Sequence, residues 1–177
     1  MPAKERTGAP GPLHGVLYSL SVWFAYAGGA VIAAIGIMSA IHIVGLWLFS
    51  SPIRGDFELV EFGIAIAATL FMPYCQAMRG HIIVDFFTQG ASKRTVRLFD
   101  AFGAFLVAIV LLLLGWRTGF AIFDMYRNGE TTTLRELPIW IAYVGMTPGL
   151  LLAGFVALAQ SLGLMQPLEA PKESDVK

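Results

Sequence analysis

Long apolar stretches alternate with short polar segments along this chain. Between Arg6 and Arg54 there is no Lys, Arg, Asp or Glu, and three more apolar stretches follow. A bilayer's hydrocarbon core is about 30 Å thick, so about 20 apolar residues in a helix are enough to cross it. The pattern predicts an all-α integral membrane protein. Its membrane domain, residues 20–164, is predicted to contain four transmembrane helices, at 20–49, 57–78, 98–123 and 139–164.

The segment between the second and third apolar stretches has a different pattern. Ile82, Ile83, Phe86 and Phe87 fall on one face of a helix, and polar residues fall elsewhere. We therefore expect a short amphipathic helix that lies in the membrane interface between the second and third transmembrane helices.

Both ends of the chain are predicted to lie outside the membrane domain. We expect residues 1–19 to form a cytoplasmic or interfacial segment, in which Leu13–Ser19 lies along the membrane surface. The first apolar stretch is far longer than the roughly 7–15 residues of a signal-peptide core, so we expect it to remain as a helix. Charged residues and prolines in residues 165–177 predict a disordered cytoplasmic tail.

The distribution of Lys and Arg predicts the orientation. Eight of these residues lie in the N-terminal segment, the loop between the second and third helices, and the tail, whereas four lie on the opposite side. Cytoplasmic segments of membrane proteins carry the excess of Lys and Arg. Both termini are therefore predicted to be cytoplasmic.

Composition excludes several classes of protein. Charged residues make up 14% of the 177 residues, against about 25% in a soluble domain. The formal net charge is zero, so nucleic acid is not an expected partner, whereas the apolar stretches make membrane lipid one. The sequence contains no phosphate-binding loop, no nucleophile constellation and no cluster with metal-ligand spacing. We therefore predict no enzyme activity, no catalytic or metal site, and no cofactor.

Two other functions remain open. His42 in the first helix could ligate iron in a haem-binding or quinone-linked redox membrane anchor, since haem iron takes axial His ligands. Glu61 could carry protons in a small homodimeric proton-coupled exporter, since acidic residues inside membranes are often functional. We expect instead that Glu58 and Glu61 lie at a hydrated helix end, where the positive N-terminus of the helix favours them.

Small residues recur four positions apart in three of the predicted helices. This spacing lets two helix backbones approach closely in lipid. Contacts within the chain and contacts with a partner are equally compatible with the pattern. The candidate packing residues are Gly29 with Ala33, Gly36 with Ala40, Gly63 with Ala67, and Gly145 with Gly149.

Several short motifs follow one another at a distinctive spacing. Glu58 and Glu61 begin the second helix, and Arg79-Gly80-His81-Ile82-Ile83-Val84-Asp85 follows its end. Leu137-Pro138-Ile139-Trp140 leads into the fourth helix, which contains Thr147-Pro148-Gly149. Over roughly residues 15–164, the chain resembles the small membrane subunit (the DctQ-like small permease) of tripartite ATP-independent periplasmic (TRAP) transporters.

The resemblance implies a role in transport without a substrate site. TRAP transporters are symporters of the bacterial inner membrane that use a sodium gradient to take up organic acids. A periplasmic substrate-binding protein delivers the substrate, and a large membrane subunit binds substrate and sodium and moves. The small subunit braces the large one, so sodium is used by the complex and is not expected to bind this chain.

Two groups of residues are candidates for structural or partner contacts. Arg79, His81 and Asp85 are expected to fix the turn at the cytoplasmic face. On the periplasmic face, charged residues are candidate contacts for the substrate-binding protein, where charge would matter most for encounter rate and specificity. These residues are Asp56, Arg127, Glu130, Arg135 and Glu136.

Overall fold

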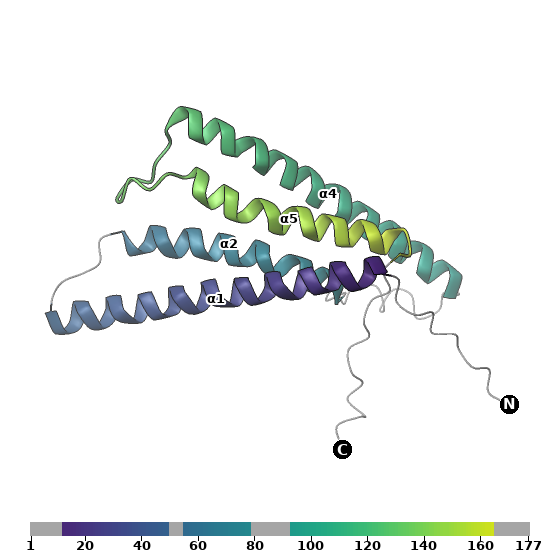
Figure 1. The fold of residues 1–177 in the computed structure, drawn as a ribbon, viewed down its shortest axis with the longest axis horizontal. Helices are drawn as coiled ribbons and strands as arrows, with labels where there is room; N and C mark the ends of the chain where they lie inside the picture. The colour runs from purple at the N-terminus through teal and green to yellow at the C-terminus, as the bar shows by residue number, and fades with distance from the viewer. Residues whose placement is uncertain (1–11, 50–54, 79–92, 165–177) are drawn as a thin grey trace, which may run out of the picture.

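Four long helices make up the part of the chain that the structure, a computed structural model, describes: residues 12–49, 55–78 and 93–164. They are α1 (Pro12–Phe49), α2 (Asp56–Ala77), α4 (Lys93–Asn128) and α5 (Trp140–Ser161) (Figure 1). All four are long and apolar enough to cross a membrane, which confirms the predicted all-α membrane-spanning architecture. The predicted amphipathic helix and the residues Arg79, His81 and Asp85 lie outside the described residues.

The helices form an open row in the order α1, α2, α5, α4. α1 packs on α2, α2 packs on α5, and α5 packs on α4, while α1 touches α5 only lightly (Figure 1). The inner helices are accordingly the more buried ones. In its most apolar window α5 is 39% buried, whereas the corresponding window of α1 is 0% buried. The arrangement leaves two broad apolar faces, unlike a closed four-helix bundle.

The outer helices are longer than the inner ones. α1 has 38 residues and α4 has 36, so they measure about 57 Å and 54 Å at a rise of 1.5 Å per residue. α2 and α5 have 22 residues each, or about 33 Å, which is close to the thickness of a hydrocarbon core. The excess length of α1 and α4 must be accommodated by tilt or by projection beyond the hydrocarbon.

Two helices extend further than the sequence predicted. α1 begins at Pro12, so Leu13–Ser19 is helical and continuous with the apolar stretch that follows it. Proline suits the first position of a helix, and no further proline stands between Pro12 and the end of the apolar stretch. α4 begins at Lys93 and ends at Asn128, where Gly129 adopts the left-handed conformation (φ 64°) that commonly follows a helix.

The two inner helices meet backbone to backbone. Pro73 has no N–H, so the Thr69 carbonyl lacks its usual donor within α2. A Cβ built on Gly149 of α5 would collide with that carbonyl oxygen. The Cα–H of Gly149 therefore faces the Thr69 carbonyl, a weak hydrogen-bonding geometry that close helix contacts use repeatedly. Any larger residue at this position must push α5 away from α2.

A buried pair of glutamines also joins the inner helices. The Gln76 side-chain amide donates to Gln160 Oε1 at 2.9 Å, and the Gln160 amide donates to the Gln76 carbonyl at 2.8 Å. Both residues are buried, at 6% and 3% exposure. Each amide therefore finds its partner inside the protein, as polar groups at membrane depth require.

Candidate functional site

A buried carboxylate fixes the loop between α4 and α5 to the first turn of α2. Glu58 is only 7% exposed. Its Oε1 accepts the Leu134 N–H at 2.7 Å, and its Oε2 accepts the Arg135 N–H at 3.0 Å and the Thr132 hydroxyl at 2.7 Å. An ionised carboxylate is a pure acceptor, so three converging donors match it. Charge-assisted hydrogen bonds of this kind are among the stronger ones in proteins.

The loop is a small hairpin with its own internal hydrogen bonds. Thr132 donates its N–H to the Leu137 carbonyl at 2.9 Å and accepts the Leu137 N–H on its hydroxyl oxygen at 3.0 Å. At the base of the hairpin, nearer to α4 and α5, the Ile139 N–H donates to the Glu130 carbonyl at 3.1 Å. Glu136 turns the chain with a left-handed φ of 55°. Because these bonds and the Glu58 anchor act together, the loop is held in one conformation.

α1 and the start of α2 are tied to the same end of the molecule. His42 Nδ1 lies 3.5 Å from the Asp56 carboxylate, which links α1 to the first residue of α2. The Arg135 side chain lies over the buried Gly55, where an added Cβ would be 2.6 Å from Arg135 Cγ. Gly55 also has a left-handed φ of 71°, so two independent constraints favour glycine there.

The candidate periplasmic residues all lie at this end of the molecule, but in different settings. Asp56 pairs with His42, and Arg135 covers Gly55, so both contribute to the internal structure. Arg127, Glu130 and Glu136 are exposed. Figure 1 shows the loop between α4 and α5 beside the start of α2, as the Glu58 hydrogen bonds require.

One carboxylate at this end differs from what the sequence indicated. Glu58 is buried, so the expectation of a hydrated carboxylate was wrong for this residue, while Glu61 one turn later is exposed. The Glu58 carboxylate takes its hydrogen-bond donors from the run of three threonines and from the backbone N–H groups that follow it. Nothing in the sequence links this loop to Glu58, because the two lie so far apart along the chain. Leu134, at the tip of the loop, is 68% exposed, which the sequence pattern did not predict.

The paired small residues divide into two groups. Gly63 packs under Ile35 of α1, Ala67 is buried, Gly145 packs under Ile66, and Gly149 meets α2 as described above. The second group lies on α1, where an added Cβ on Gly29 or Gly36 would have no neighbour within 4 Å and the alanines that follow are exposed. It consists of Gly29, Ala33, Gly36 and Ala40, and we call it the open face of α1.

A recess lies beneath the hairpin between α2, α4 and α5. It has a volume of about 580 Å³ and is lined by Glu58, Glu61, Thr118 and the three loop threonines, among others. The carboxylate of Glu58 is already occupied by loop donors. Among the described residues there is no group of three or more His, Cys, Asp or Glu side chains that could hold a metal ion.

Comparison with known proteins decides the family. The model of the family described as "Tripartite ATP-independent periplasmic transporters, DctQ component" matches residues 35–166, from the middle of α1 to just past α5. The chain belongs to the DctQ family. As a DctQ component it is a small, multi-pass membrane subunit of a TRAP transporter, and the family consists of transporter components and not of enzymes. Searches of curated proteins and of solved structures found no match.

Proposed function

We propose that the chain is a non-catalytic brace for the large, substrate-translocating subunit of a TRAP transporter in the bacterial inner membrane. The complex would import an organic acid with sodium, delivered by a periplasmic binding protein. Sodium and substrate would bind to the large subunit. The two termini would lie in the cytoplasm, because the excess of Lys and Arg lies on their side.

The open row of helices is the observation that carries this proposal. A helical membrane protein that works alone encloses its polar site between helices, whereas this row has two broad faces and an outer helix with no buried residue in its most apolar window. The two glutamines that join its inner helices are paired with one another and with the backbone. An open row of helices of this kind suits a rigid, stationary element beside a partner that moves.

The open face of α1 is the proposed contact with the large subunit. Small residues allow helix backbones to approach closely, which is a main source of helix association in lipid. Apart from the adjoining backbone of α1 itself and the two chain neighbours, no atom of the described chain would lie within 4 Å of a Cβ at Gly29 or Gly36. A larger side chain at either position would therefore not disturb the packing of this chain and would clash only with a partner.

The hairpin is the proposed contact with the binding protein. Its tip presents the exposed Leu134, flanked by exposed charge at Glu130 and Glu136. The Glu58 anchor fixes the hairpin before any partner arrives, so little conformational entropy is lost on docking. An apolar anchor with a charged rim is the usual composition of a protein contact site.

Co-purification tests the brace. The double variant Gly29→Leu/Gly36→Leu is expected to fold as well as the original chain but to lose the large subunit during purification. Gly103→Leu is the matched control, because Gly103 lies on α4 with the same empty surroundings. If the double variant retains the large subunit and full uptake activity, the open face of α1 is not the contact.

A separate experiment tests the hairpin. In proteoliposomes with the complete transporter, Leu134→Ser is expected to raise the concentration of binding protein needed for half-maximal uptake. Thr133→Ser, at the neighbouring exposed position, is expected to leave it unchanged. An unaltered response in Leu134→Ser would show that the binding protein docks elsewhere.

A further inference from the structure

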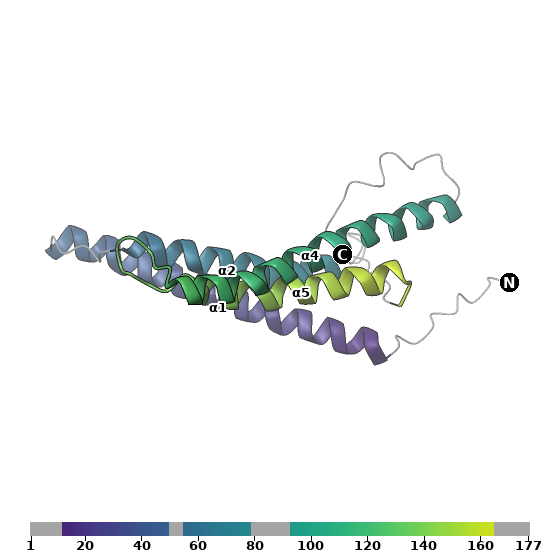
Figure 2. The same ribbon diagram turned by 90° about the horizontal axis from the view of Figure 1, so that it is seen from above.

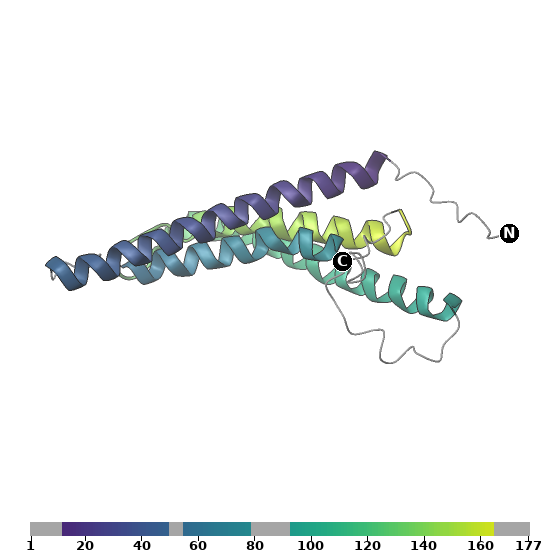
Figure 3. The same ribbon diagram turned by 90° about the horizontal axis from the view of Figure 1, so that it is seen from below.

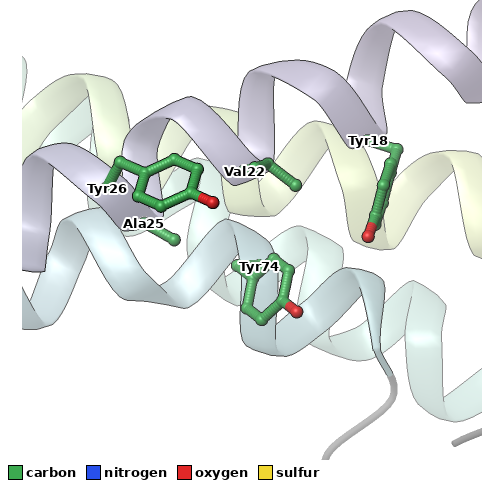
Figure 4. Close-up of a pocket in the computed structure, with 5 residues that line it drawn as sticks. All are labelled: Tyr18, Val22, Ala25, Tyr26 and Tyr74. Atoms are coloured by element: carbon green, nitrogen blue, oxygen red, sulfur yellow. The ribbon is translucent and has the colours of Figure 1, made fainter.

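A second cavity lies at the opposite end of the molecule, between α1 and α2. It has a volume of about 360 Å³ and is lined by Tyr18, Val22, Ala25 and Tyr26 of α1 and by Tyr74 of α2. Figure 4 shows the three tyrosines around one gap, with Val22 between Tyr18 and Tyr26. The volume lies within the range of roughly 300–1,000 Å³ that is typical of small-molecule sites.

The cavity has a simple structural cause. α1 and α2 approach closely at Gly28, where an added Cβ would be 3.3 Å from the Ala67 carbonyl oxygen. From there the two helices diverge toward the N-terminal end of α1, as the views from above and below show (Figures 2 and 3). The small side chains of Val22 and Ala25 do not fill the space that opens.

The polar groups of the cavity find no hydrogen-bond partners among the residues that the structure describes. Among the residues that the structure describes, none forms a hydrogen bond with the hydroxyls of Tyr18, Tyr26 or Tyr74. Tyr18 is nevertheless well positioned, because its ring packs against the buried cluster of Ala77, Val156 and Ala159. A buried or half-buried phenol ordinarily finds a hydrogen-bond acceptor.

The position of the tyrosines defines the kind of acceptor. Tyr18 lies within two turns of the start of α1, and Tyr74 lies within one turn of the end of α2, so both lie near a membrane surface. Hydrocarbon chains contain no acceptors. A neighbouring transmembrane helix offers few, because its own backbone consumes its carbonyls. Interfacial water and the ester and phosphate oxygens of a glycerophospholipid lie at this depth and are acceptors, but only the lipid also brings a hydrocarbon chain that can cover the apolar side chains of Val22 and Ala25.

We propose that this cavity is a specific binding site for one glycerophospholipid. Tyr18 and Tyr74 donate hydrogen bonds to its ester or phosphate oxygens, and the first part of one acyl chain lies along Val22 and Ala25. The site would fill the space between α1 and α2 and hold the outer helix in place. Tyr18 and Tyr26 lie outside the residues that the family model matches, and the inference does not depend on the transport role.

Native mass spectrometry of the full chain tests the site. The chain is purified in mild detergent and supplied with phosphatidylethanolamine and phosphatidylglycerol. The original chain is expected to retain one lipid. Tyr18→Phe/Tyr74→Phe removes two hydrogen bonds and should weaken retention by on the order of tenfold. Ala25→Phe fills the cavity and should abolish retention even if the phenols contribute little.

The control removes two phenols from the other end of the molecule. Tyr126→Phe/Tyr143→Phe keeps both rings and should leave lipid retention unchanged. Equal retention by the original chain, Tyr18→Phe/Tyr74→Phe and Ala25→Phe would overturn the proposal, because only non-specific annular lipid would then be present. A photo-reactive residue at position 22 that cross-links to protein and not to lipid would overturn it as well.

Discussion

The contact between Gly149 and the Thr69 carbonyl gives the sharpest prediction about the fold. In Gly149→Ala, the new Cβ would lie 2.6 Å from the Thr69 carbonyl carbon and 3.0 Å from the Leu70 nitrogen. Carbon atoms in contact prefer about 3.5–4.0 Å, so α5 must move away from α2 by about 1 Å. The obstructing atoms belong to the backbone, and no side-chain rotation relieves the clash.

Two opposing effects determine the magnitude. Alanine is favoured over glycine in a helix by about 1 kcal/mol. Overpacking a well-filled contact costs about 1–3 kcal/mol, and here the separation also weakens the Cα–H contact, worth about 0.5–1 kcal/mol, to a carbonyl that Pro73 leaves without its usual donor. We therefore expect Gly149→Ala to lower the free energy of unfolding by about 1–2 kcal/mol.

Reversible unfolding of the purified chain in mixed detergent micelles measures this change. Gly36→Ala is the matched control, because nothing lies within 4 Å of its added Cβ. It should be neutral, or stabilising by up to about 1 kcal/mol. The two substitutions are chemically identical, so the difference between them measures the contact, and Gly149→Ala should be the less stable variant by about 1–3 kcal/mol. Equal stability in both variants would refute the close backbone contact between α2 and α5.

Three further predictions concern polar groups. Gln76→Leu and Gln160→Leu should each cost about 0.6–1.7 kcal/mol in the same unfolding assay, and the double variant should cost less than their sum because both remove one interaction. Glu58→Gln should accelerate amide hydrogen exchange at Thr132–Leu137, because the amide group of glutamine repels some of the donors that the carboxylate accepts. Glu61→Gln, at an exposed position, should leave the exchange unchanged. Equal exchange in the two variants would contradict the anchoring role of Glu58. A cysteine at Asn128, with Cys75 replaced, should react with a membrane-impermeant maleimide from the periplasm, and reaction only after the cells are opened would reverse the proposed orientation.

The sequence was sufficient for the helices because each apolar stretch carries its own signal. Apolar runs predicted four membrane-spanning helices, although α4 ends five residues later than the predicted end at residue 123. The start of α1 was misjudged because an apolar surface segment and the first turns of a spanning helix have similar composition. Only the backbone continuity from Pro12 onward distinguishes them.

The site was harder to predict because its contacts join distant positions. Glu58 finds its donors in a loop more than seventy residues away, and Gln76 finds Gln160 across 84 positions. The small-residue motifs had the spacing of helix-packing residues, but the spacing did not indicate which neighbour each residue faces. Gly149 turned out to face α2, while Gly29 and Gly36 face away from the chain. Helix rotation, which decides this, is set by packing and not by local sequence.

Uptake in proteoliposomes tests the central claim most directly. Vesicles would contain this chain alone, the large subunit alone, or both, with an inward sodium gradient and the loaded binding protein outside. We predict that only vesicles with both subunits accumulate the organic acid at the full rate, and that this chain alone accumulates none. Sodium-dependent accumulation by vesicles that contain only this chain would contradict the account.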